Sequence, residues 1–158
     1  MGSLECDGSR HLHAGFKTEK NNETKYTVDL GRYNEETQTI IPRFKSRVMT
    51  SLSNEDWTGS LVMNYVSGYT DKDITALNLT TMKDEKITGQ RVSSYLTWDV
   101  ISTYAINKKM DVRVAIFNLM NQQAPLSFSQ TRFQVFGANT VNSQLWGRTL
   151  QLGATLRF

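Results

Sequence analysis

His11 and His13 lie two residues apart, and on a β-strand this spacing directs both imidazoles to the same face. Two such imidazoles are the beginning of a zinc site, which normally takes four ligands from His, Cys or carboxylate side chains. No Cys, Asp or Glu stands at a spacing that completes the set, and the single cysteine, Cys6, falls in a segment without pattern. We therefore predict no metal and no cofactor for this pair.

A second group of potential ligands lies between residues 70 and 90, a polar stretch rich in Asp, Lys and Thr. Its carboxylates are Asp71, Asp73, Asp84 and Glu85. They do not follow the Asp-x-Asp-x-Asp-Gly spacing of a calcium-binding loop, and carboxylates are ordinary in a solvated loop. We predict no cation site here.

The sequence also lacks the patterns that activate a nucleophile. It has no Gly-x-Ser-x-Gly turn and no Gly-rich phosphate loop, and Cys6 is far from any patterned histidine. The chain is therefore predicted not to be an enzyme. Its net charge of +3 comes from acidic and basic residues interspersed along the chain, without a basic stripe, so a nucleic-acid partner is not expected either.

Alternation of apolar and polar residues is the strongest pattern in the chain, and it predicts a series of β-strands. The expected strands are about Phe44 to Leu52, Trp57 to Tyr69, Val92 to Ile106, Met110 to Ile116 and Thr149 to Phe158. Very short turns alternate with two long connections, 70–90 and 118–147, which we interpret as loops. Connections of this length are unusual in compact soluble domains, whereas short turns on one side and long loops on the other are typical of outer-membrane barrels.

The region before Phe44 is less regular. A hairpin about Asn21 and Asn22 is predicted from two flanking segments, 11–17 and 24–30, and residues 1–20 are interpreted as a poorly patterned or non-native terminus. The first residues contain no apolar run of the length that a secretory signal requires. We therefore expect the chain to be the C-terminal piece of a longer protein. No run of about 18 apolar residues occurs, which excludes a transmembrane helix but not a barrel strand.

The predicted strands have one apolar and one polar row. The apolar row includes Met63, Trp98, Val114 and Leu152, and in a barrel it faces lipid. The polar row includes Asp99, Asp111, Arg113 and Arg157, which are expected to line the interior, mostly as cross-strand pairs and less often in contact with a ligand. The expected membrane girdle is Trp57, Tyr69, Trp98 and Tyr104. Trp57 and Tyr69 are separated by roughly 28 Å after tilt, close to an apolar bilayer band. The alternative is that these aromatic residues pack the core of a sandwich.

The end of the chain resembles the assembly signal of bacterial outer-membrane β-barrels. That signal runs polar, any, Gly, any, any, apolar, any, terminal aromatic, and Gln151, Gly153, Leu156 and Phe158 match it. Three further features are Trp98 with Asp99, the run Asn118-Leu119-Met120-Asn121 followed by Pro125, and Gly147 with Arg148 before the last strand. Together with the ending they resemble the C-terminal end of a TonB-dependent outer-membrane receptor, over about Pro42 to Phe158. Met120 stands where Phe is commoner in that family.

The resemblance implies an all-β, antiparallel up-and-down meander over residues 21–158, forming the last five or so strands of a 22-stranded transmembrane barrel. It also implies a bacterial outer-membrane location and import of a scarce ligand of the siderophore, cobalamin, haem or glycan class. The implied partners are outer-membrane lipid, the barrel-assembly machinery, TonB, a plug domain and a small-molecule ligand, the last three in the full-length protein. Neither plug nor TonB box is found in this sequence, so the chain alone is not expected to transport anything.

Two other functions remain open from the sequence. One is a small soluble barrel that encloses an apolar ligand as lipocalin-like binders do, with Asp99, Asp111, Arg113 and Arg157 facing outward. The other is a complete small outer-membrane barrel of about eight strands with a structural or adhesive function.

Overall fold

All the secondary structure that the described residues form is β. The structure, a computed structural model, describes the backbone of residues 3–12, 17–20, 23–28, 30–34, 37–128, 134–135 and 137–158. It describes the side chains of residues 30–34, 37–128 and 137–158. His13 lies outside the described residues, and the His11 side chain is likewise not described. The predicted all-β class is confirmed.

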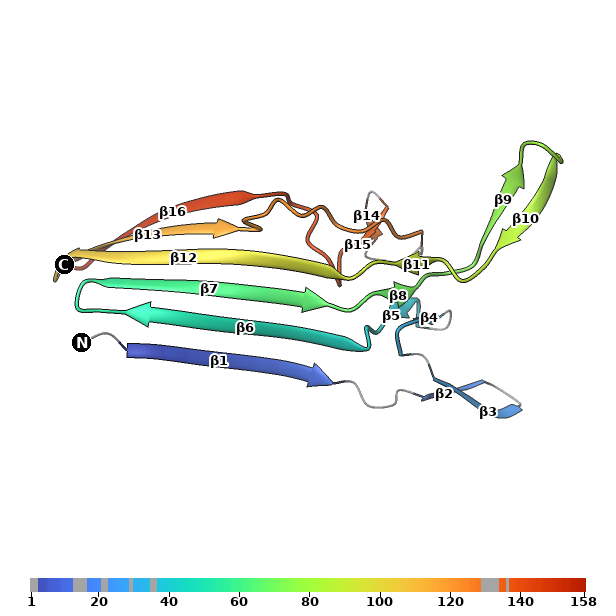
Figure 1. The fold of residues 1–158 in the computed structure, drawn as a ribbon, viewed down its shortest axis with the longest axis horizontal. Helices are drawn as coiled ribbons and strands as arrows, with labels where there is room; N and C mark the ends of the chain where they lie inside the picture. Colours follow the sequence, from blue (N-terminus) through green and yellow to red (C-terminus); the bar gives the residue numbers. More distant parts are fainter. Residues whose placement is uncertain are drawn as a thin grey trace.

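One six-stranded antiparallel sheet forms the body of the molecule (Figure 1). Its strands follow one another in chain order across the sheet: β1 (Ser3–Leu12), β6 (Phe44–Ser53), β7 (Trp57–Val66), β12 (Tyr95–Asn107), β13 (Met110–Phe117) and β16 (Thr149–Leu156). The antiparallel up-and-down meander that the resemblance implies is therefore confirmed for the five strands predicted from alternation. The strand β1, which pairs with β6 along its whole length, was not predicted.

The two ends of the sheet differ, as the connection lengths predicted. At one end Asn54 closes the β6–β7 turn by accepting a hydrogen bond from the Trp57 backbone N–H at 2.9 Å, and Asn107 likewise caps the β12–β13 turn through the Lys109 N–H at 2.9 Å. At the other end lie five small two-stranded sheets: β2 (Lys17–Lys20) with β3 (Glu23–Val28), β4 (Tyr33–Asn34) with β5 (Thr39–Ile40), β8 (Tyr69–Thr70) with β11 (Arg91–Val92), β9 (Ile74–Asn78) with β10 (Lys83–Ile87), and β14 (Gln134–Val135) with β15 (Ala138–Asn139). We call this the loop end.

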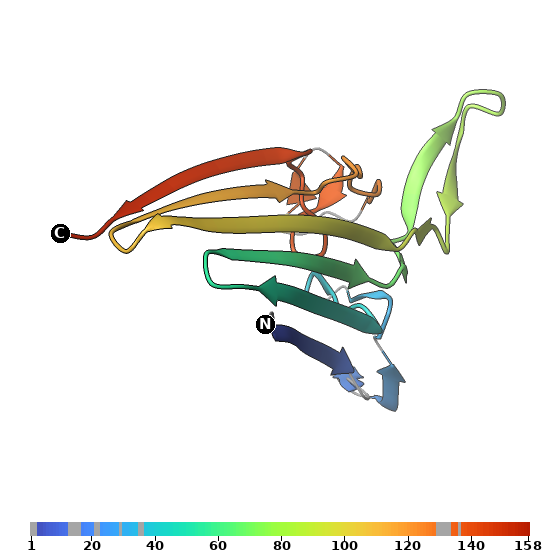
Figure 2. The same ribbon diagram turned by 60° about the vertical axis from the view of Figure 1, so that its left-hand side comes forward.

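The long polar stretch between residues 70 and 90 is a hairpin and not an irregular loop, which corrects the sequence interpretation. Strands β9 and β10 project from the loop end of the sheet (Figure 2). Asn78 builds the tip, because its side-chain oxygen accepts the Thr80 N–H at 2.9 Å and its amide donates to the Glu85 carboxylate at 2.9 Å. The connection 118–147 also contains a short pair, β14 and β15. A hairpin of β2 and β3 is present, as predicted, but the segment predicted for its first strand, 11–17, overlaps β2 only at Lys17 and begins within β1. Asn21 and Asn22 themselves lie outside the described residues.

Cross-strand register sorts the side chains of the main sheet into two faces. Trp98 is opposite Met63, and Val114 is opposite Leu152, so the predicted apolar row lies on one face. We call this the apolar face. Its exposed large side chains are Leu52, Trp57, Leu61, Leu96, Tyr104, Ile106, Val114, Leu150, Leu152 and Leu156. The residues with predominantly polar side chains lie on the opposite side, which we call the polar face.

The polar face is nevertheless the more covered one. Val62 is fully buried and Ala115 is 1% exposed, although both belong to this face. The connection between β13 and β16 also lies over part of this face, near Thr97 and Asp99. The apolar face has no such cover: Leu152 is 69% exposed and Leu150 62%. The described residues thus form an open sheet that exposes its apolar side. It does not provide the enclosed apolar interior on which a lipocalin-like binder depends.

A small apolar cluster at the loop end contains Ile40, Tyr69 and Val92, with Tyr33 packed against it. Tyr69 is only 6% exposed and therefore does not belong to a lipid-facing girdle, which corrects that prediction. The physical reason is that β7 ends at Val66, and the break at Ser67 and Gly68 interrupts the alternation that related Tyr69 to Trp57. At Gly68 a Cβ would meet the Val92 carbonyl oxygen at 2.6 Å, so the chain passes too close here for any side chain.

Candidate functional site: the polar face and its pocket

Asp99 on β12 is the centre of the polar face. Its side chain is 9% exposed, and both carboxylate oxygens accept hydrogen bonds. One oxygen accepts from the Asn64 side-chain amide at 2.8 Å, and the other accepts from the Asn118 backbone N–H at 2.9 Å. Because hydrogen bonds to a carboxylate are about twice as strong as neutral ones, Asp99 fastens the end of β13 to the sheet.

Asn118 and Asn121 shape the turn that follows β13. Both have positive φ, 53° in each case, a conformation that Asn tolerates better than most residues. The fully buried Asn118 side chain accepts from the Gln122 N–H at 2.8 Å and donates to the Gln122 carbonyl at 2.9 Å. Asn121 accepts from the Arg148 N–H at 2.9 Å, just before β16 begins. At Gly147 a Cβ would meet the Asn121 side-chain oxygen at 2.7 Å.

Three separate sequence features are therefore brought together at one place. Trp98 and Asp99, the run 118–121, and Gly147 with Arg148 meet at the loop end, near the start of β12, the end of β13 and the start of β16. The Trp98 carbonyl accepts from the Leu119 N–H at 2.7 Å and completes the contact. We call this arrangement the strand junction. Its hydrogen bonds fix where the closing strand begins, and no single segment of the sequence predicts them.

The other predicted polar residues lie on the same face toward the short-turn end. Asp111 forms an ion pair with Arg157, and the Arg157 N–H donates to the Lys109 carbonyl at 2.8 Å, so the pair ties the end of β16 to β13. Arg113 is exposed between them and the strand junction. The predicted cross-strand pairing thus exists for Asp111 and Arg157, while Asp99 is held by amide groups instead.

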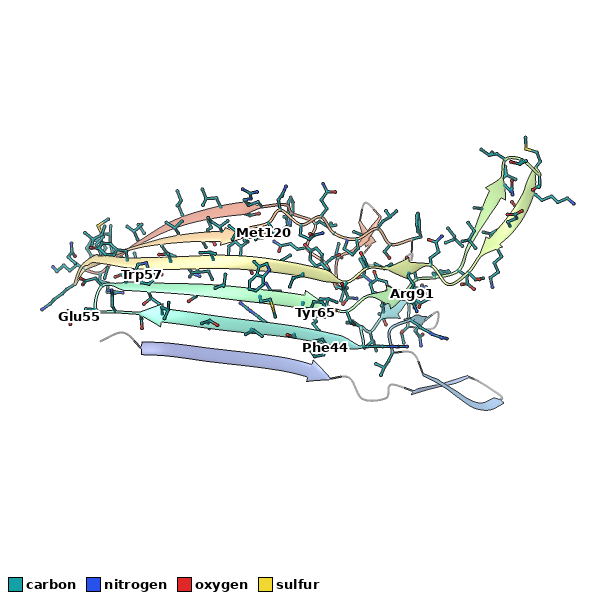
Figure 3. The ribbon with its side chains drawn as sticks, viewed as in Figure 1. Phe44, Glu55, Trp57, Tyr65, Arg91 and Met120 are labelled. Carbon is teal, nitrogen blue, oxygen red and sulfur yellow. The ribbon has the colours of Figure 1, made fainter. Side chains whose placement is uncertain are left out.

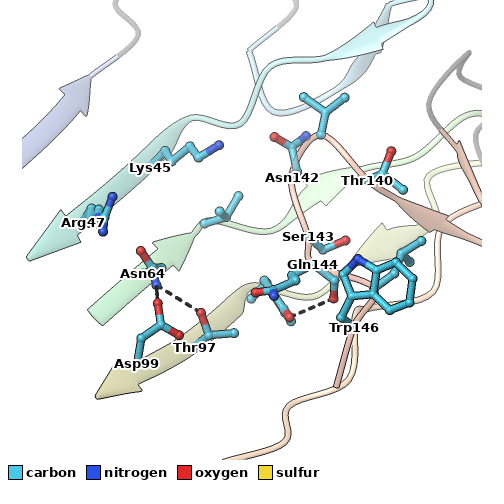
Figure 4. A pocket seen from close by; sticks show the side chains of 14 residues that line it. Lys45, Arg47, Asn64, Thr97, Asp99, Thr140, Asn142, Ser143, Gln144 and Trp146 are labelled. Atoms are coloured by element: carbon cyan, nitrogen blue, oxygen red, sulfur yellow. Dashed lines mark hydrogen bonds between the residues drawn. The ribbon is translucent and has the colours of Figure 1, made fainter. Parts of the chain in front are cut away.

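An open pocket of about 510 Å³ lies between the polar face and the connection that precedes β16 (Figure 4). Its floor is formed by β6, β7 and β12, with Lys45, Arg47 and Thr97 among the lining residues. Residues 140–146 form the other wall, where the Tyr95 hydroxyl donates to the Gln144 carbonyl at 3.1 Å. Lys45, Arg47 and Trp146 were not among the predicted site residues. The alternation of Lys45 and Arg47 with Phe44, Ser46 and Val48 is a signal that could have indicated the two cations.

The predicted assembly-signal residues are all on or just beyond β16. Gln151 is opposite Ala115, Gly153 opposite Arg113 and Leu156 opposite Met110. Phe158 follows the strand and is fully exposed. The other edge of β16 has no partner strand in the described part of the chain.

Aromatic side chains mark both ends of the apolar face (Figure 3). Trp57 and Tyr104 are opposite each other at the short-turn end. At the loop end the rings of Phe44 and Tyr65 pack with centroids 5.9 Å apart, a pair that sequence analysis missed in favour of Tyr69. Trp57 and Tyr65 are separated by roughly 26 Å along β7, or about 20 Å along a membrane normal at a tilt near 40°. Trp98 lies between the two groups, opposite Met63.

Gly59 makes room for the Trp57 ring, which also donates from Nε1 to the Ser102 hydroxyl at 2.8 Å. A Cβ at Gly59 would lie 2.3 Å from Trp57 Cζ2. We therefore expect Gly59→Val to expel the indole and lower the free energy of unfolding by about 1–3 kcal/mol, as overpacking usually does. Chemical unfolding monitored by fluorescence measures the loss. Gly153→Val is the matched control, because a Cβ there meets nothing within 4 Å. Equal costs for the two variants would contradict this account.

Three of the four carboxylates between residues 70 and 90 have structural contacts: Asp71, Asp73 and Glu85. Asp71 is buried and accepts the backbone N–H groups of Lys72 and Phe128. Burial raises the pKa of the neighbouring Tyr69 phenol, and the charge of Asp71 adds to the rise, while hydrogen bonds from Ser127 and Asn139 oppose it. Asp73 pairs with Lys86 at 3.0 Å, and this contact lowers the pKa of the Asp73 carboxyl. Among residues with described side chains, no three His, Cys, Asp or Glu residues cluster as metal ligands.

In the described part of the chain no helix is long and apolar enough to cross a membrane. No protein family, curated protein or solved structure was found to match this chain.

Proposed function

We propose that the chain is the C-terminal wall of a TonB-dependent receptor in the bacterial outer membrane, which imports a scarce small molecule. The observation that carries the proposal is the opposite character of the two sheet faces. Large apolar side chains are left uncovered along one face, as Leu152 and Leu150 illustrate, while charged groups and the connection before β16 occupy the other. In lipid, an exposed apolar face is stabilising, and a polar face belongs inside the barrel.

The unpaired edges of the sheet support the same proposal. Both β1 and β16 have only one neighbour in the described sheet. An unsatisfied backbone group in hydrocarbon costs several kcal/mol, so a sheet of this kind in a membrane requires further strands on each side. Such strands belong to the rest of the receptor in our proposal. The 158-residue chain supplies one arc of the wall and does not transport by itself.

The closing strand supplies the contact with the barrel-assembly machinery. In this proposal the free edge of β16 pairs with a strand of that machinery, and Gln151, Gly153, Leu156 and Phe158 give the pairing its specificity. The exposure of every residue in β16 is consistent with such a contact. TonB and a plug domain act on the complete receptor. In this proposal the polar face lines the interior of the barrel, where it contacts the ligand.

The proposed orientation can be tested with lipids that carry bromine high on the acyl chains, because bromine quenches tryptophan only at short range. Two single-tryptophan forms of the chain are compared in vesicles, one keeping Trp57 and the other Trp146. Trp57 is on the apolar face, whereas Trp146 lines the pocket. We expect strong quenching of Trp57 and weak quenching of Trp146. Trp146 is 76% exposed and Trp57 38%, so simple accessibility predicts the reverse order, and that order would refute the proposal.

A further inference from the structure

The pocket on the polar face carries two cations without ion-pair partners among the described residues. Lys45 and Arg47 are both exposed and both line the pocket. They are two residues apart on β6, so their side chains leave the same side of the strand about 7 Å from each other. The ion pairs of the described residues join Lys86 with Asp73 and Arg157 with Asp111, elsewhere in the molecule.

The Asp99 carboxylate offsets at most one of the two positive charges of this wall. It is the carboxylate among the lining residues, but it is nearly buried and both of its oxygens already accept hydrogen bonds from Asn64 and Asn118. Two exposed cations and one nearly buried carboxylate therefore line the pocket, and the charges of these side chains sum to a net positive charge. A concave surface with a net positive lining concentrates anions. The pocket is consequently suited to an anion.

The opposite wall offers a flat apolar surface. Trp146 is 76% exposed and lies across the pocket from Lys45 and Arg47 (Figure 4). The Tyr95–Gln144 hydrogen bond holds this wall near the sheet. Between β6 and β12 the floor is two strand spacings wide, or roughly 10 Å, which is the length of a ring joined to an acidic group. Exposed indoles stack readily on other rings.

We propose that the pocket binds a small organic anion that carries a flat ring, with its acidic group at Lys45 and Arg47 and its ring against Trp146. A volume of about 510 Å³ lies within the range of small-molecule sites. The inference deepens the proposed function and rests on it, because it names the ligand class of the face that the receptor turns to its interior. The acidic group is a carboxylate or a phosphate.

The test uses the full 158-residue chain in detergent micelles and four probes, titrated by calorimetry. Phenyl phosphate and benzoate carry both ring and charge and distinguish phosphate from carboxylate. Inorganic phosphate carries the charge alone and benzyl alcohol the ring alone. We expect one of the first two probes to bind saturably and at least about tenfold more tightly than either half-probe, a difference of about 1.4 kcal/mol. Added salt should weaken its binding. The absence of saturable binding by both ring-bearing anions, in a folded chain, would overturn the inference.

Substitutions distinguish binding in the pocket from nonspecific electrostatic attraction of the probe to the chain. The double variant Lys45→Gln with Arg47→Gln should lower the affinity for the probe by about tenfold or more, because charge-assisted hydrogen bonds are lost. The matched control, Lys108→Gln with Lys109→Gln, removes equal charge at the short-turn end and should change binding by less than about twofold. Trp146→Leu should weaken the ring-bearing probe and leave inorganic phosphate unaffected. Equal losses in both double variants would refute the site.

Unfolding midpoints equal to that of the unaltered chain show that each variant is folded. The outcome is also separable from that of the brominated-lipid experiment. Saturable binding together with quenching of Trp146 in place of Trp57 would reject the membrane orientation and leave the pocket intact. Quenching of Trp57 without saturable binding would support the membrane orientation and reject the proposed pocket.

Discussion

Replacing Asn118 with Ala is expected to lower the free energy of unfolding by about 2–5 kcal/mol. The Asn118 side chain is fully buried and makes both a donated and an accepted hydrogen bond with the Gln122 backbone. Each such bond contributes about 0.5–1.5 kcal/mol, and a non-glycine residue held at positive φ costs roughly 1–2 kcal/mol more when its side chain cannot compensate locally. Urea unfolding of the chain in detergent, followed by circular dichroism, measures the loss.

Asn118→Gly separates the two causes, because glycine tolerates the φ of 53° but lacks the side-chain hydrogen bonds. It should recover roughly 1 kcal/mol of the loss caused by alanine. Amide exchange in β16 should accelerate in both variants, since Asn118 precedes the Asn121–Arg148 contact that begins this strand. An alanine variant as stable as the unaltered chain would show that the strand junction does not hold β16 in place.

The strands of the main sheet that were predictable from the sequence are those with one apolar and one polar face. In β16 polar and apolar residues alternate strictly. The prediction that its apolar residues share a face with those of β13 agrees with the register, in which Leu152 is opposite Val114. The hairpin β9–β10 was missed because none of the residues in its two strands is buried, so a hydrophobic core imposes no clear period of two on its sequence. The signal that would have indicated it is Asn78, a turn-forming residue between Ile74 and Ile87, which pair at the base of the hairpin.

The site was less predictable than the sheet because it depends on contacts between distant segments. Alternation places Asp99 on the polar face, but the Asn64 and Asn118 partners come from two other strands and follow only from register. Trp146 precedes the closing strand without any pattern, and its place in the pocket depends on how residues 140–146 fold back over β12. The prediction of Tyr69 as a girdle residue was wrong for a related reason. The prediction assumed one strand from Trp57 to Tyr69, but β7 ends at Val66 and Tyr69 belongs to β8, after a break of two residues.

Replacing Leu152 with Arg distinguishes a lipid-facing sheet from one that faces water. Leu152 is near the middle of β16 and 69% exposed on the apolar face. If this face meets hydrocarbon, the buried charge should destabilise the folded chain in lipid vesicles by about 2–4 kcal/mol. In water an exposed substitution of this kind changes stability by only about ±0.5 kcal/mol.

Gln151→Arg is the matched control because it introduces the same side chain at the adjacent position, also exposed, on the opposite face of the same strand. It should leave stability in vesicles within about 0.5 kcal/mol of the unaltered chain, since a charge on the polar face is solvated inside a barrel. Urea titration in thin-lipid vesicles measures both variants. A larger cost for Gln151→Arg than for Leu152→Arg would mean that the polar face meets the lipid. Equal small costs would mean that neither face does, and either result would reject the receptor wall while leaving the six-stranded sheet itself in place.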